Sequence, residues 1–389
     1  MKERMYNTFY RITKIKALAK ILAFLGYKIL ILYYYIARLF LKEKLTISKE
    51  EALKKVNKLS PKPKLKNDSW EEIALTKKET DLSIIVPAYN ASDYIKECIE
   101  SVLKQKTSYD YELIVINDGS KDDTLNKINS FKDNHLKIIN QENKGFSGAR
   151  NRGINIARGK YIMFLDSDDI LCENAIEILL KKAYEKNIDI VQGSYYTFNK
   201  NKEKFYSKIK IEEINKNDDK PINMPGFPWG KIYKSELFNE VRFPEGYWYE
   251  DTIVNYLLSR KSRKYLAISN CVYGYRINPK GITITSKKSN KVTDSYWIVE
   301  QMINESKRLN LNIDKETYEM TIIHLSSILY RRIHVLGREE MKNIFILASY
   351  LMENIGIRES KEKTRIFRDI EKAFKEKNYS LWKMASFLI

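Results

Sequence analysis

The sequence contains few of the side chains that build disulfide frameworks or histidine metal sites. Its 389 residues include three cysteines and three histidines, scattered along the chain. They are Cys98, Cys172, Cys271, His135, His324 and His334. Three cysteines cannot all pair with one another, which favours a reducing compartment. A histidine-rich metal centre is not expected either.

Two nucleotide-binding motifs are also missing. The chain has neither the Gly-x-Gly-x-x-Gly turn that holds a dinucleotide nor the Gly-x-x-x-x-Gly-Lys-Ser/Thr loop that cradles phosphates. Any bound phosphate must therefore be neutralised in another way. Apolar residues make up 43% of the chain and charged residues 31%, which is ordinary globular composition and excludes wholesale disorder.

Positive charge is concentrated at the N-terminus. The formal net charge is +19. Residues 1–66 carry 17 Lys and Arg against 4 Asp and Glu, an excess of 13, so the other 323 residues carry an excess of only 6. A nucleic acid, an anionic membrane surface or an acidic small molecule would each suit such a charge. Its position indicates a partner of the N-terminal segment rather than of the whole chain.

Residues 21–41 form a long apolar, tyrosine-rich run that is interrupted by Lys28 and Arg38. The run could nearly span a bilayer, but a lysine near its centre costs roughly 3 kcal/mol on insertion scales. We predict that residues 1–45 form a helical anchor lying on an anionic membrane surface. The alternatives are a true span, or a helix packed on the protein itself or on a partner. Residues 46–80, which contain the Pro- and Lys-rich stretch 60–64 with two X-Pro steps, are expected to be a linker.

Strands and helices alternate between about residues 81 and 195. Short β-branched runs predict strands, and amphipathic stretches predict helices between them, which together indicate a Rossmann-like, mostly parallel α/β sheet. The expected strands are 82–87, 112–116, 136–139, 161–165 and 188–191, and the expected helices are 95–103, 147–158 and 176–183.

Polar side chains follow three of these strands at the point where each ends. Tyr89 and Asn90 follow the first strand, Asp118 ends the second, and Asp166 and Asp168 follow the fourth. Ligands of parallel α/β sheets bind at this edge. Asp-x-Asp supplies the hard oxygen ligands that suit Mg²⁺ or Mn²⁺. A lone Asp-x-Asp is more often a turn, but three polar strand ends at one edge favour a metal site.

At these residues the chain resembles glycosyltransferase family 2, the inverting nucleotide-sugar enzymes of the GT-A fold. Four segments occur in family order: 83–90 (SIIVPAYN), 117–120 (NDGS), 145–153 (GFSGARNRG) and 164–169 (FLDSDD). Each segment alone is weak evidence, but their ordered occurrence is specific. The resemblance implies a GT-A fold and a UDP-linked sugar donor.

The resemblance also implies roles for individual residues of the donor half, 81–195. Asp118 would accept a hydrogen bond from the uracil imide, with the base bordered by other residues of the first two segments. Asp168 would bind the metal, and Asp166 the metal or the ribose. Arg150 would hold the acidic cluster or a phosphate, or be a structural ion pair. Asp169 is expected to start the following helix. The predicted donor-binding set is Pro87, Tyr89, Asn90, Asp118, Arg150, Asp166, Ser167 and Arg276.

Residues 196–295 are expected to bind the acceptor. Segments 228–233 (PWGKIY) and 245–252 (EGYWYEDT) resemble family motifs, which implies that Asp251 is the general base and Glu250 its bracing neighbour. The alternative is that these two carboxylates cap a helix. Contact with the acceptor is also predicted for Trp229, Lys231 and Trp248, although both tryptophans suit core packing equally well.

The segment around 273–283 resembles the part of the family that folds over the diphosphate. Arg276 would assist the leaving group there, or lie on the surface. This chain has Gly281-Ile282-Thr283 where the family often has Ser-Ile-Thr. Residues 296–389 are expected to be helical, because apolar residues recur at helical spacing.

These expectations together predict a metal-dependent, inverting transfer from a UDP-sugar to a hydroxyl of a glycan or lipid-linked acceptor in surface polysaccharide synthesis. The cofactor would be Mn²⁺ or Mg²⁺, and the place the cytoplasmic face of the membrane. Transfer of a sugar phosphate or polyol phosphate is one alternative. A non-catalytic nucleic-acid-binding protein is another, but the acidic strand ends and the lack of a recognition motif count against nucleic acid.

Overall fold

The computed structural model describes residues 1–64, 79–199, 201, 203–207, 209, 211–215, 224–279, 289–356 and 363–389. The chain divides into two compact units. The helical unit comprises Met1–Lys62, Ser286–Glu300 and Ile313–Ile389, and the sheet unit comprises Pro63–Thr285 and Gln301–Asn312. The N-terminal segment and the C-terminal helices, which were expected as separate regions, therefore belong to one unit.

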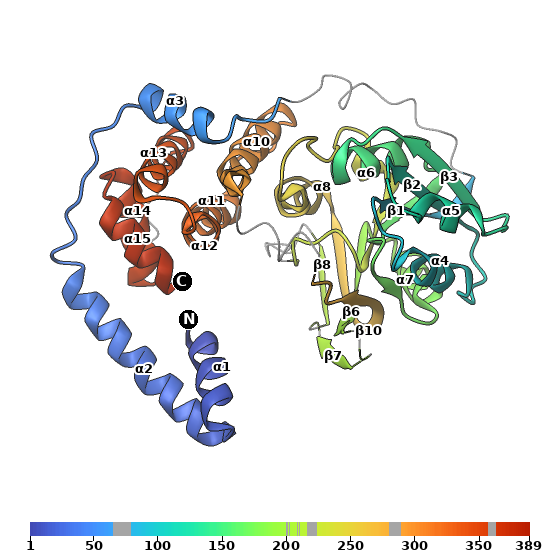
Figure 1. The fold of residues 1–389 in the computed structure, drawn as a ribbon, viewed down its shortest axis with the longest axis horizontal. Coiled ribbons are helices and arrows are strands. Elements are labelled where there is room, and N and C mark those ends of the chain that lie inside the picture. Colours follow the sequence, from blue (N-terminus) through green and yellow to red (C-terminus); the bar gives the residue numbers. More distant parts are fainter. Residues whose placement is uncertain are drawn as a thin grey trace. The chain divides into compact units, whose positions relative to one another are not determined.

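A ten-stranded mixed sheet forms the centre of the sheet unit (Figure 1). Its order is β3-β2-β1-β4-β9-β6-β10-β5, with β7 paired to β6 and β8 to β10. Strands β3, β2, β1 and β4 are parallel, while β9 runs antiparallel to β4 and β6. The predicted α/β class is confirmed. The strands are β1 (Thr80–Ala88), β2 (Tyr111–Asp118), β3 (Leu136–Gln141), β4 (Gly159–Phe164), β5 (Ile170–Leu171), β6 (Ile190–Phe198), β7 (Lys204–Ser207), β8 (Glu212–Asn215), β9 (Lys231–Lys234) and β10 (Lys264–Arg276).

Helices cover both faces of the parallel strands. Leu82 and Ile84 of β1 share a core cluster with residues of α4 (Ile95–Leu103), α5 (Thr124–Asn129) and α7 (Ala175–Lys186). Ile85 points the other way, toward α6 (Gly145–Ile156): a Cβ on Gly153 of α6 would lie 2.4 Å from its Cγ2. Because both faces are covered, β1 and β2 are continuous apolar runs rather than alternating ones.

Helices also make up most of the described helical unit, as predicted for the C-terminal region. The segments of the unit include α1 (Lys2–Thr13), α2 (Lys16–Ala37), α3 (Lys49–Leu59), α11 (Lys315–Ile323), η8 (His324–Ile328), α12 (Leu329–Ile333), α13 (Arg338–Asn354), α14 (Arg365–Lys375) and α15 (Tyr379–Leu388). The helix α10 (Asp294–Arg308), preceded by η7 (Asn290–Thr293), has residues in both units.

The helix α3 lies in the stretch 46–80 that was expected to be a linker, so the expectation is wrong for these residues. Ser48 caps the helix by accepting a hydrogen bond from the Glu51 amide at 3.1 Å. Ala52 and Val56, four residues apart, are buried on one side of it. The helix α3, which is capped and has an apolar stripe, packs on α13. Residues 65–78 lie outside the described residues.

The C-terminal end of α2 is fastened to α14. The Tyr34 hydroxyl donates to Asp369 Oδ2 at 2.6 Å, and the Arg38 guanidinium reaches both oxygens of Asp369 at 2.6 and 2.8 Å. Tyr34 is fully buried. The packing alternative for residues 21–41 therefore holds at this end of the helix.

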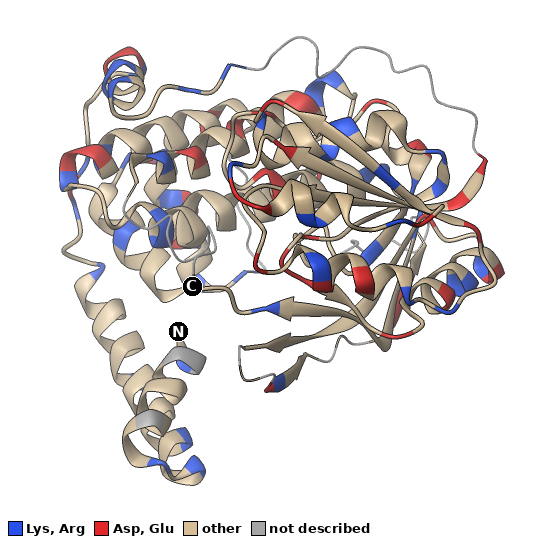
Figure 2. Cartoon of the chain, turned by 45° about the vertical axis from the view of Figure 1, so that its right-hand side comes forward, with Lys and Arg blue, Asp and Glu red and all other residues tan. Residues whose placement is uncertain are grey.

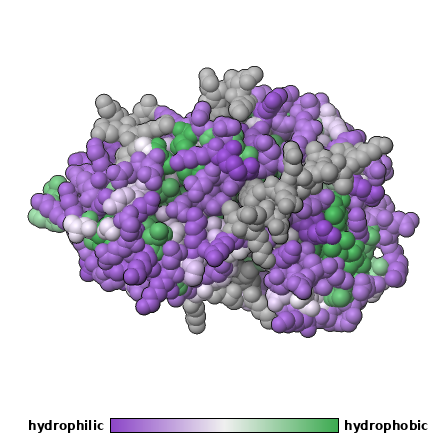
Figure 3. All heavy atoms as spheres, turned by 90° about the horizontal axis from the view of Figure 1, so that it is seen from above, coloured by the Kyte–Doolittle hydropathy of each residue, from purple (hydrophilic) through white to green (hydrophobic). Residues whose placement is uncertain are grey.

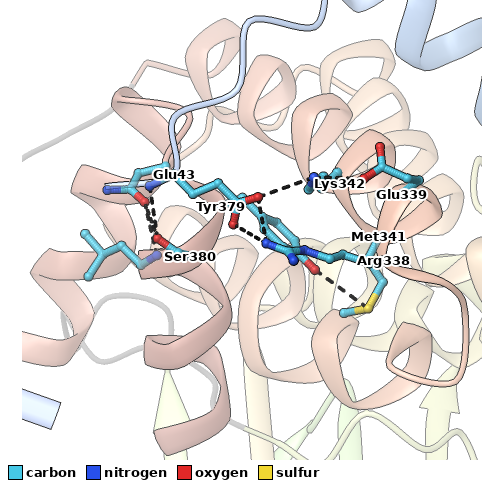
Figure 4. A network of polar contacts seen from close by, with 9 residues as sticks. Glu43, Arg338, Glu339, Met341, Lys342, Tyr379 and Ser380 are labelled. Carbon is cyan, nitrogen blue, oxygen red and sulfur yellow. Dashed lines mark hydrogen bonds and ion pairs between the residues drawn. The ribbon is translucent and has the colours of Figure 1, made fainter. Parts of the chain in front are cut away.

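The chain after α2 continues this attachment along α13 and α15 (Figure 4). The Glu43 carboxylate pairs with Arg338 at 2.9 Å and with Lys342 at 3.3 Å. Its backbone amide donates to Ser380 Oγ at 3.2 Å, and its carbonyl accepts from the Tyr379 amide at 2.9 Å. Residues 34–45 are thus bound to the C-terminal helices by side-chain and backbone contacts.

The rest of α2 exposes large apolar side chains. Phe24, Ile29 and Leu32 are 45%, 68% and 62% exposed. In Figure 2 the helix is mostly tan with isolated basic positions. By length and composition, α2 is the one helix within the described ranges that could cross a membrane. Core helices and signal sequences can meet the same criteria, so this finding does not choose among the three predicted arrangements.

Candidate functional site

The ends of β1 and β4 part where the candidate site begins. Pairing of β1 with β4 stops at Ile85 and Phe164, whereas pairing with β2 continues to Ala88 and Asn117. Pro87 lies just beyond the last pair with β4. Proline has no amide hydrogen for a ladder, so it suits a strand at the point where a neighbour departs.

Asn90 ties the turn after β1 to the turn after β2. Its amide donates to Ser120 Oγ at 3.0 Å, and its side-chain Oδ1 accepts from the Lys121 amide at 2.8 Å. Its φ of 48° is left-handed, a conformation that asparagine tolerates better than most residues. The preceding Tyr89 is 46% exposed. Contact of either residue with a donor stays a prediction.

Asp118 ends β2 and is held in place by two donors. Its Oδ1 accepts from the Gln141 side chain at 2.7 Å and from the Lys144 amide at 2.8 Å. The residue is only 2% exposed. Within the described part of the chain, Oδ2 makes no hydrogen bond. The carboxylate is therefore fixed in orientation and retains an acceptor. Gln141 and Lys144 carry no sequence signal that would have identified them.

Arg150, on α6, joins the two predicted halves of the site. Its Nη2 donates to Asp166 Oδ1 at 2.9 Å, and its Nη1 donates to Glu250 Oε1 at 2.5 Å. The side chain also lies over the ring of Phe243, 5.2 Å from its centroid. The ion-pair role is therefore what the structure shows, and one partner is the predicted neighbour of the base.

The surroundings of Arg150 keep it charged. The residue is 3% exposed. Burial alone would lower the pKa of Arg150, but the carboxylates of Asp166 and Glu250 outweigh burial and raise that pKa. The guanidinium is thus a permanent positive charge between two acidic motifs.

A helix was expected to start at Asp169. The loop after β4 instead continues past this residue. The next helix, α7, begins at Ala175 with Asn174 as its cap. Asp169 is instead 1% exposed and accepts from the Tyr273 hydroxyl at 2.7 Å and from the Arg276 amide at 2.6 Å. Its carboxylate thereby joins the loop to β10.

Arg276 lies inside this network rather than on the surface. Its Nε donates to the Asp168 carbonyl at 2.6 Å, and its Nη2 donates to Glu97 Oε2 at 2.6 Å. Its guanidinium packs over the rings of Tyr94 and Phe198. These contacts hold Arg276 beside the acidic loop, and its predicted contact with a leaving group stays a prediction.

Asp166 and Asp168 match the donor chemistry that Mg²⁺ or Mn²⁺ requires. Both are partly exposed, as is Ser167 between them. Arg150 occupies one oxygen of Asp166, and Asn278 donates to Oδ2 of Asp168 at 2.9 Å. Burial raises the pKa of Asp168, the Asn278 hydrogen bond opposes this, and the charge of Asp166 raises it further. A nearby cation would favour the charged carboxylate and so lower the pKa of Asp168 again.

The pair does not form an all-protein metal cage. Within the described ranges, no group of three or more His, Cys, Asp or Glu side chains could hold a metal ion. Mg²⁺ is often bound by one or two carboxylates with water and substrate phosphates as the remaining ligands. The two aspartates fit that arrangement.

Glu250 and Asp251 open a helical run in the second half of the site. The run starts with η4 (Glu250–Thr252) and continues through η5 (Val254–Leu258) to α8 (Ser259–Lys261). Tyr249 precedes it with a left-handed φ of 64°. Both carboxylates therefore lie at a helix start, as the capping alternative expected, and Glu250 also pairs with Arg150.

Lys231 lies near Asp251 but is fully buried. Its Nζ donates to the Phe227 carbonyl at 2.6 Å and lies 4.0 Å from the centre of the Phe227 ring. Burial lowers the pKa of Lys231 well below its usual value, and the charge of Asp251 opposes this. This lysine is therefore part of the protein interior, and direct contact with an acceptor stays a prediction.

Trp229 packs in the core of the sheet unit. Its ring stacks on Phe227 at 3.7 Å and on Tyr273 at 4.6 Å between centroids, and it is 8% exposed. Trp248 is half-buried and meets Tyr249 edge-on at 6.4 Å. Core packing accounts for Trp229, while sugar stacking stays a prediction for both. The motif at Gly281-Ile282-Thr283 lies outside the described residues.

Comparisons of the sequence with known proteins match one family. A family model described as glycosyl transferase family 2 matches residues 83–242. Glycosyltransferase GlyG of Streptococcus pneumoniae is 33% identical over 249 residues, which cover 60% of this chain and 82% of that protein. UDP-Glc:α-D-GlcNAc-diphosphoundecaprenol β-1,3-glucosyltransferase WfgD of Escherichia coli is 42% identical over 121 residues, which cover 31% of this chain and 47% of that protein. Among solved structures, S. aureus TarS 1–349 in complex with UDP-GlcNAc gives a TM-score of 0.48 at 19% identity, covering 77% of this chain and 93% of that chain.

Proposed function

The chain belongs to glycosyltransferase family 2, and on that premise we propose that it transfers a sugar from a UDP-linked donor to a hydroxyl of a glycan or lipid-linked glycan. The observation that supports this most directly is the position of Arg150. One buried side chain contacts Asp166, of the predicted donor motif, and Glu250, the neighbour of the predicted base. The two motifs that the reaction needs are therefore within the reach of a single guanidinium.

In the proposed reaction, the Asp251 carboxylate takes the proton of the acceptor hydroxyl. The hydroxyl oxygen then attacks the anomeric carbon from the side opposite the diphosphate. The bond from that carbon to the diphosphate oxygen breaks, and UDP leaves with the electron pair. Attack from the opposite face inverts the anomeric configuration.

Four residues of this chain would support that step. Asp166 and Asp168 would hold a divalent cation, which when bound neutralises the charge that develops on the diphosphate. Arg150 binds both Asp166 and Glu250. The distance between the proposed metal ligand Asp166 and Glu250, the neighbour of the proposed base, is therefore fixed. Such positioning lowers the barrier because the reacting groups need no further ordering.

The choice of uracil rests on Asp118. Its carboxylate is oriented by Gln141 and Lys144 and retains an acceptor oxygen, which suits the imide N–H of uracil. The E. coli relative is named for a UDP-Glc donor, which supports the same choice.

The acceptor and location are proposed on separate grounds. The name of that relative includes a diphosphoundecaprenol-linked acceptor, so we propose a lipid-linked acceptor for this chain as well. An enzyme with such a substrate works at a membrane. The basic, apolar N-terminal segment would place it on the cytoplasmic face, where anionic lipids attract it.

Donor hydrolysis tests the proposal. The full chain is incubated with Mn²⁺ and UDP-, GDP- or dTDP-linked sugars, and the released nucleotide is measured. We expect release of UDP from one or more UDP-sugars, and we expect excess EDTA to abolish it. Undiminished activity in EDTA would overturn the metal role, and activity with GDP-sugars alone would overturn the role of Asp118. The mass of a transferred product separates sugar transfer from sugar-phosphate transfer, because the latter adds a phosphate.

A further inference from the structure

The end of β10 holds the Asp166–Asp169 loop at several points. The Tyr273 hydroxyl donates to Asp169 Oδ2 at 2.7 Å and accepts from the Asp166 amide at 3.3 Å. Five residues later, Asn278 donates to Asp168 Oδ2 at 2.9 Å. Two side chains from one segment thus contact both ends and the middle of a four-residue loop.

Tyr273 is well placed to fix this loop because it is itself immobilised. Its side chain is fully buried, and its ring stacks on Trp229 of the predicted acceptor motif at 4.6 Å. A hydroxyl on a packed ring has one available position. The hydroxyl therefore holds the loop that carries Asp166 at a fixed place relative to the core.

The loop needs such support because three carboxylates follow one another closely in it. Asp169 is 1% exposed, and Asp166 and Asp168 precede it by three residues and one residue in the same loop. Like charges in a small volume repel one another unless donors compensate them. Tyr273 supplies a donor at Asp169 and Asn278 supplies one at Asp168.

We propose that Tyr273 and Asn278 are positioning residues, which hold Asp166 and Asp168 in the orientation that binds the divalent cation. This inference rests on the proposed function of the two aspartates. Groups that hydrogen-bond metal ligands orient them, and their loss typically weakens metal binding by about 10- to 100-fold. Neither residue bears a charge, so any effect on the cation arises through the aspartates that they hold.

Two pairs of substitutions on the same strand and its extension test the proposal. Tyr273→Phe removes one buried hydroxyl, and its control, Tyr265→Phe, removes another on β10 that donates to Gln192 at 3.0 Å. Asn278→Ala removes the donor to Asp168, and its control, Asn270→Ala, removes an exposed amide of β10. Mn²⁺ affinity is measured by the electron paramagnetic resonance signal of free Mn²⁺ with UDP present, because substrate phosphates are among the expected ligands. Thermal unfolding and the kcat and KM for the UDP-sugar are measured alongside.

We expect Tyr273→Phe and Asn278→Ala each to weaken Mn²⁺ binding by about tenfold or more and to lower kcat. Both controls should leave Mn²⁺ affinity and kcat near those of the unchanged chain. Because Tyr265→Phe also removes a buried hydroxyl that donates a hydrogen bond, we expect it to lose thermal stability as Tyr273→Phe does. The Asn278→Ala variant alters a half-buried side chain, so it remains informative if Tyr273→Phe fails to fold.

Unchanged Mn²⁺ affinity in both variants, with only stability affected, would overturn the positioning role and leave the proposed function standing. Failure of the unchanged chain to bind Mn²⁺ or release UDP is a different result. It would overturn the proposed function itself, and this inference with it.

Discussion

Arg150 binds two carboxylates, Asp166 and Glu250, that lie 16 and 100 residues further along the chain. Its nearness to the acidic cluster was predicted, because the segment around it, 145–153, resembles a motif of the family. Its second partner, Glu250, is 100 residues away and could not be found from spacing. The same holds for Gln141 on Asp118 and Tyr273 on Asp169. Such partners depend on tertiary packing, which leaves no local pattern in the sequence.

Replacing Arg150 should destabilise the sheet unit as well as the reaction. Arg150→Met leaves Asp166 and Glu250 close together without a cation, and breaking a buried pair in this way costs about 3 kcal/mol. Arg150→Lys should recover only part of the loss, because an ammonium lacks the guanidinium fork that reaches two carboxylates. Urea denaturation measures both. A lysine variant as stable and active as the unchanged chain would contradict the bridging role.

A double variant tells the ion pair apart from simple packing. In Arg150→Met with Glu250→Gln, one of the two unpaired charges is gone, so part of the stability should return. Arg150→Met, Glu250→Gln, the double variant and the unchanged chain form a thermodynamic cycle, and we expect a coupling between residues 150 and 250 above about 0.5 kcal/mol. Additive losses would show that the charges do not interact.

Among elements, local pattern predicted the parallel strands and most helices well, and it failed where pairing is distant or short. The strands β1, β2 and β4 each contain a run of apolar residues, and helices separate the strands β1 to β4 along the chain, which is a local signal. In contrast, β9 has four residues and pairs with both β4 and β6, which no periodicity reveals. The helix α3 was not predicted, because Pro61 and Pro63, which follow it, favour extended chain and indicated a linker over residues 46–80.

The attachment of α2 to α14 gives a prediction about an element. Asp369→Ala removes the acceptor of both Tyr34 and Arg38, which leaves a buried hydroxyl and a guanidinium without their partner. Losing such a partner costs about 1–3 kcal/mol for each buried group. We expect trypsin to cleave the α2 region faster in this variant than in the unchanged chain.

The control for this experiment is Glu353→Ala, which removes an exposed carboxylate of α13 with a long contact to Lys377 at 4.0 Å. Its cleavage rate should match that of the unchanged chain. Equal rates for Asp369→Ala would mean that Asp369 does not hold α2 in place.

In the whole molecule, the charge and the chemistry are separated along the chain. The positive excess of residues 1–66 falls almost entirely on the part that the helical unit contributes, whereas the predicted donor, metal and base residues all lie in the sheet unit. The face in Figure 3 is mostly hydrophilic, with hydrophobic areas in separate patches. Most of the positive excess therefore lies outside the unit that carries the predicted catalytic residues.

Exposed apolar residues of α2 should control binding to lipid. Replacing Phe24, Ile29 and Leu32 together by serine removes side chains worth about 1.5–3 kcal/mol each when fully buried. We expect binding to vesicles that contain anionic lipid to weaken at least about tenfold, as measured by co-sedimentation. Substitution is cleaner than deletion of residues 1–45, because deletion would also remove Tyr34 and Arg38 from α14.

The matched control replaces Phe205, Tyr206 and Ile211, which are 57%, 65% and 66% exposed in the sheet unit. Vesicle binding should survive in that variant and should weaken with added salt, since basic residues contribute to it. Equal losses in the two triple variants would argue against α2 as the membrane contact.

The role of Asp251 is the central claim, and Asp251→Asn tests it most directly. The substitution keeps the size of the side chain and removes its ability to accept a proton. We predict that sugar transfer slows by about 10²- to 10⁴-fold, which is the usual contribution of a general base. Calorimetry should show that UDP affinity is unchanged in the same preparation, because Asp118, the proposed contact of the uracil ring, is untouched. Transfer at the normal rate by Asp251→Asn would contradict the assignment of Asp251 as the general base.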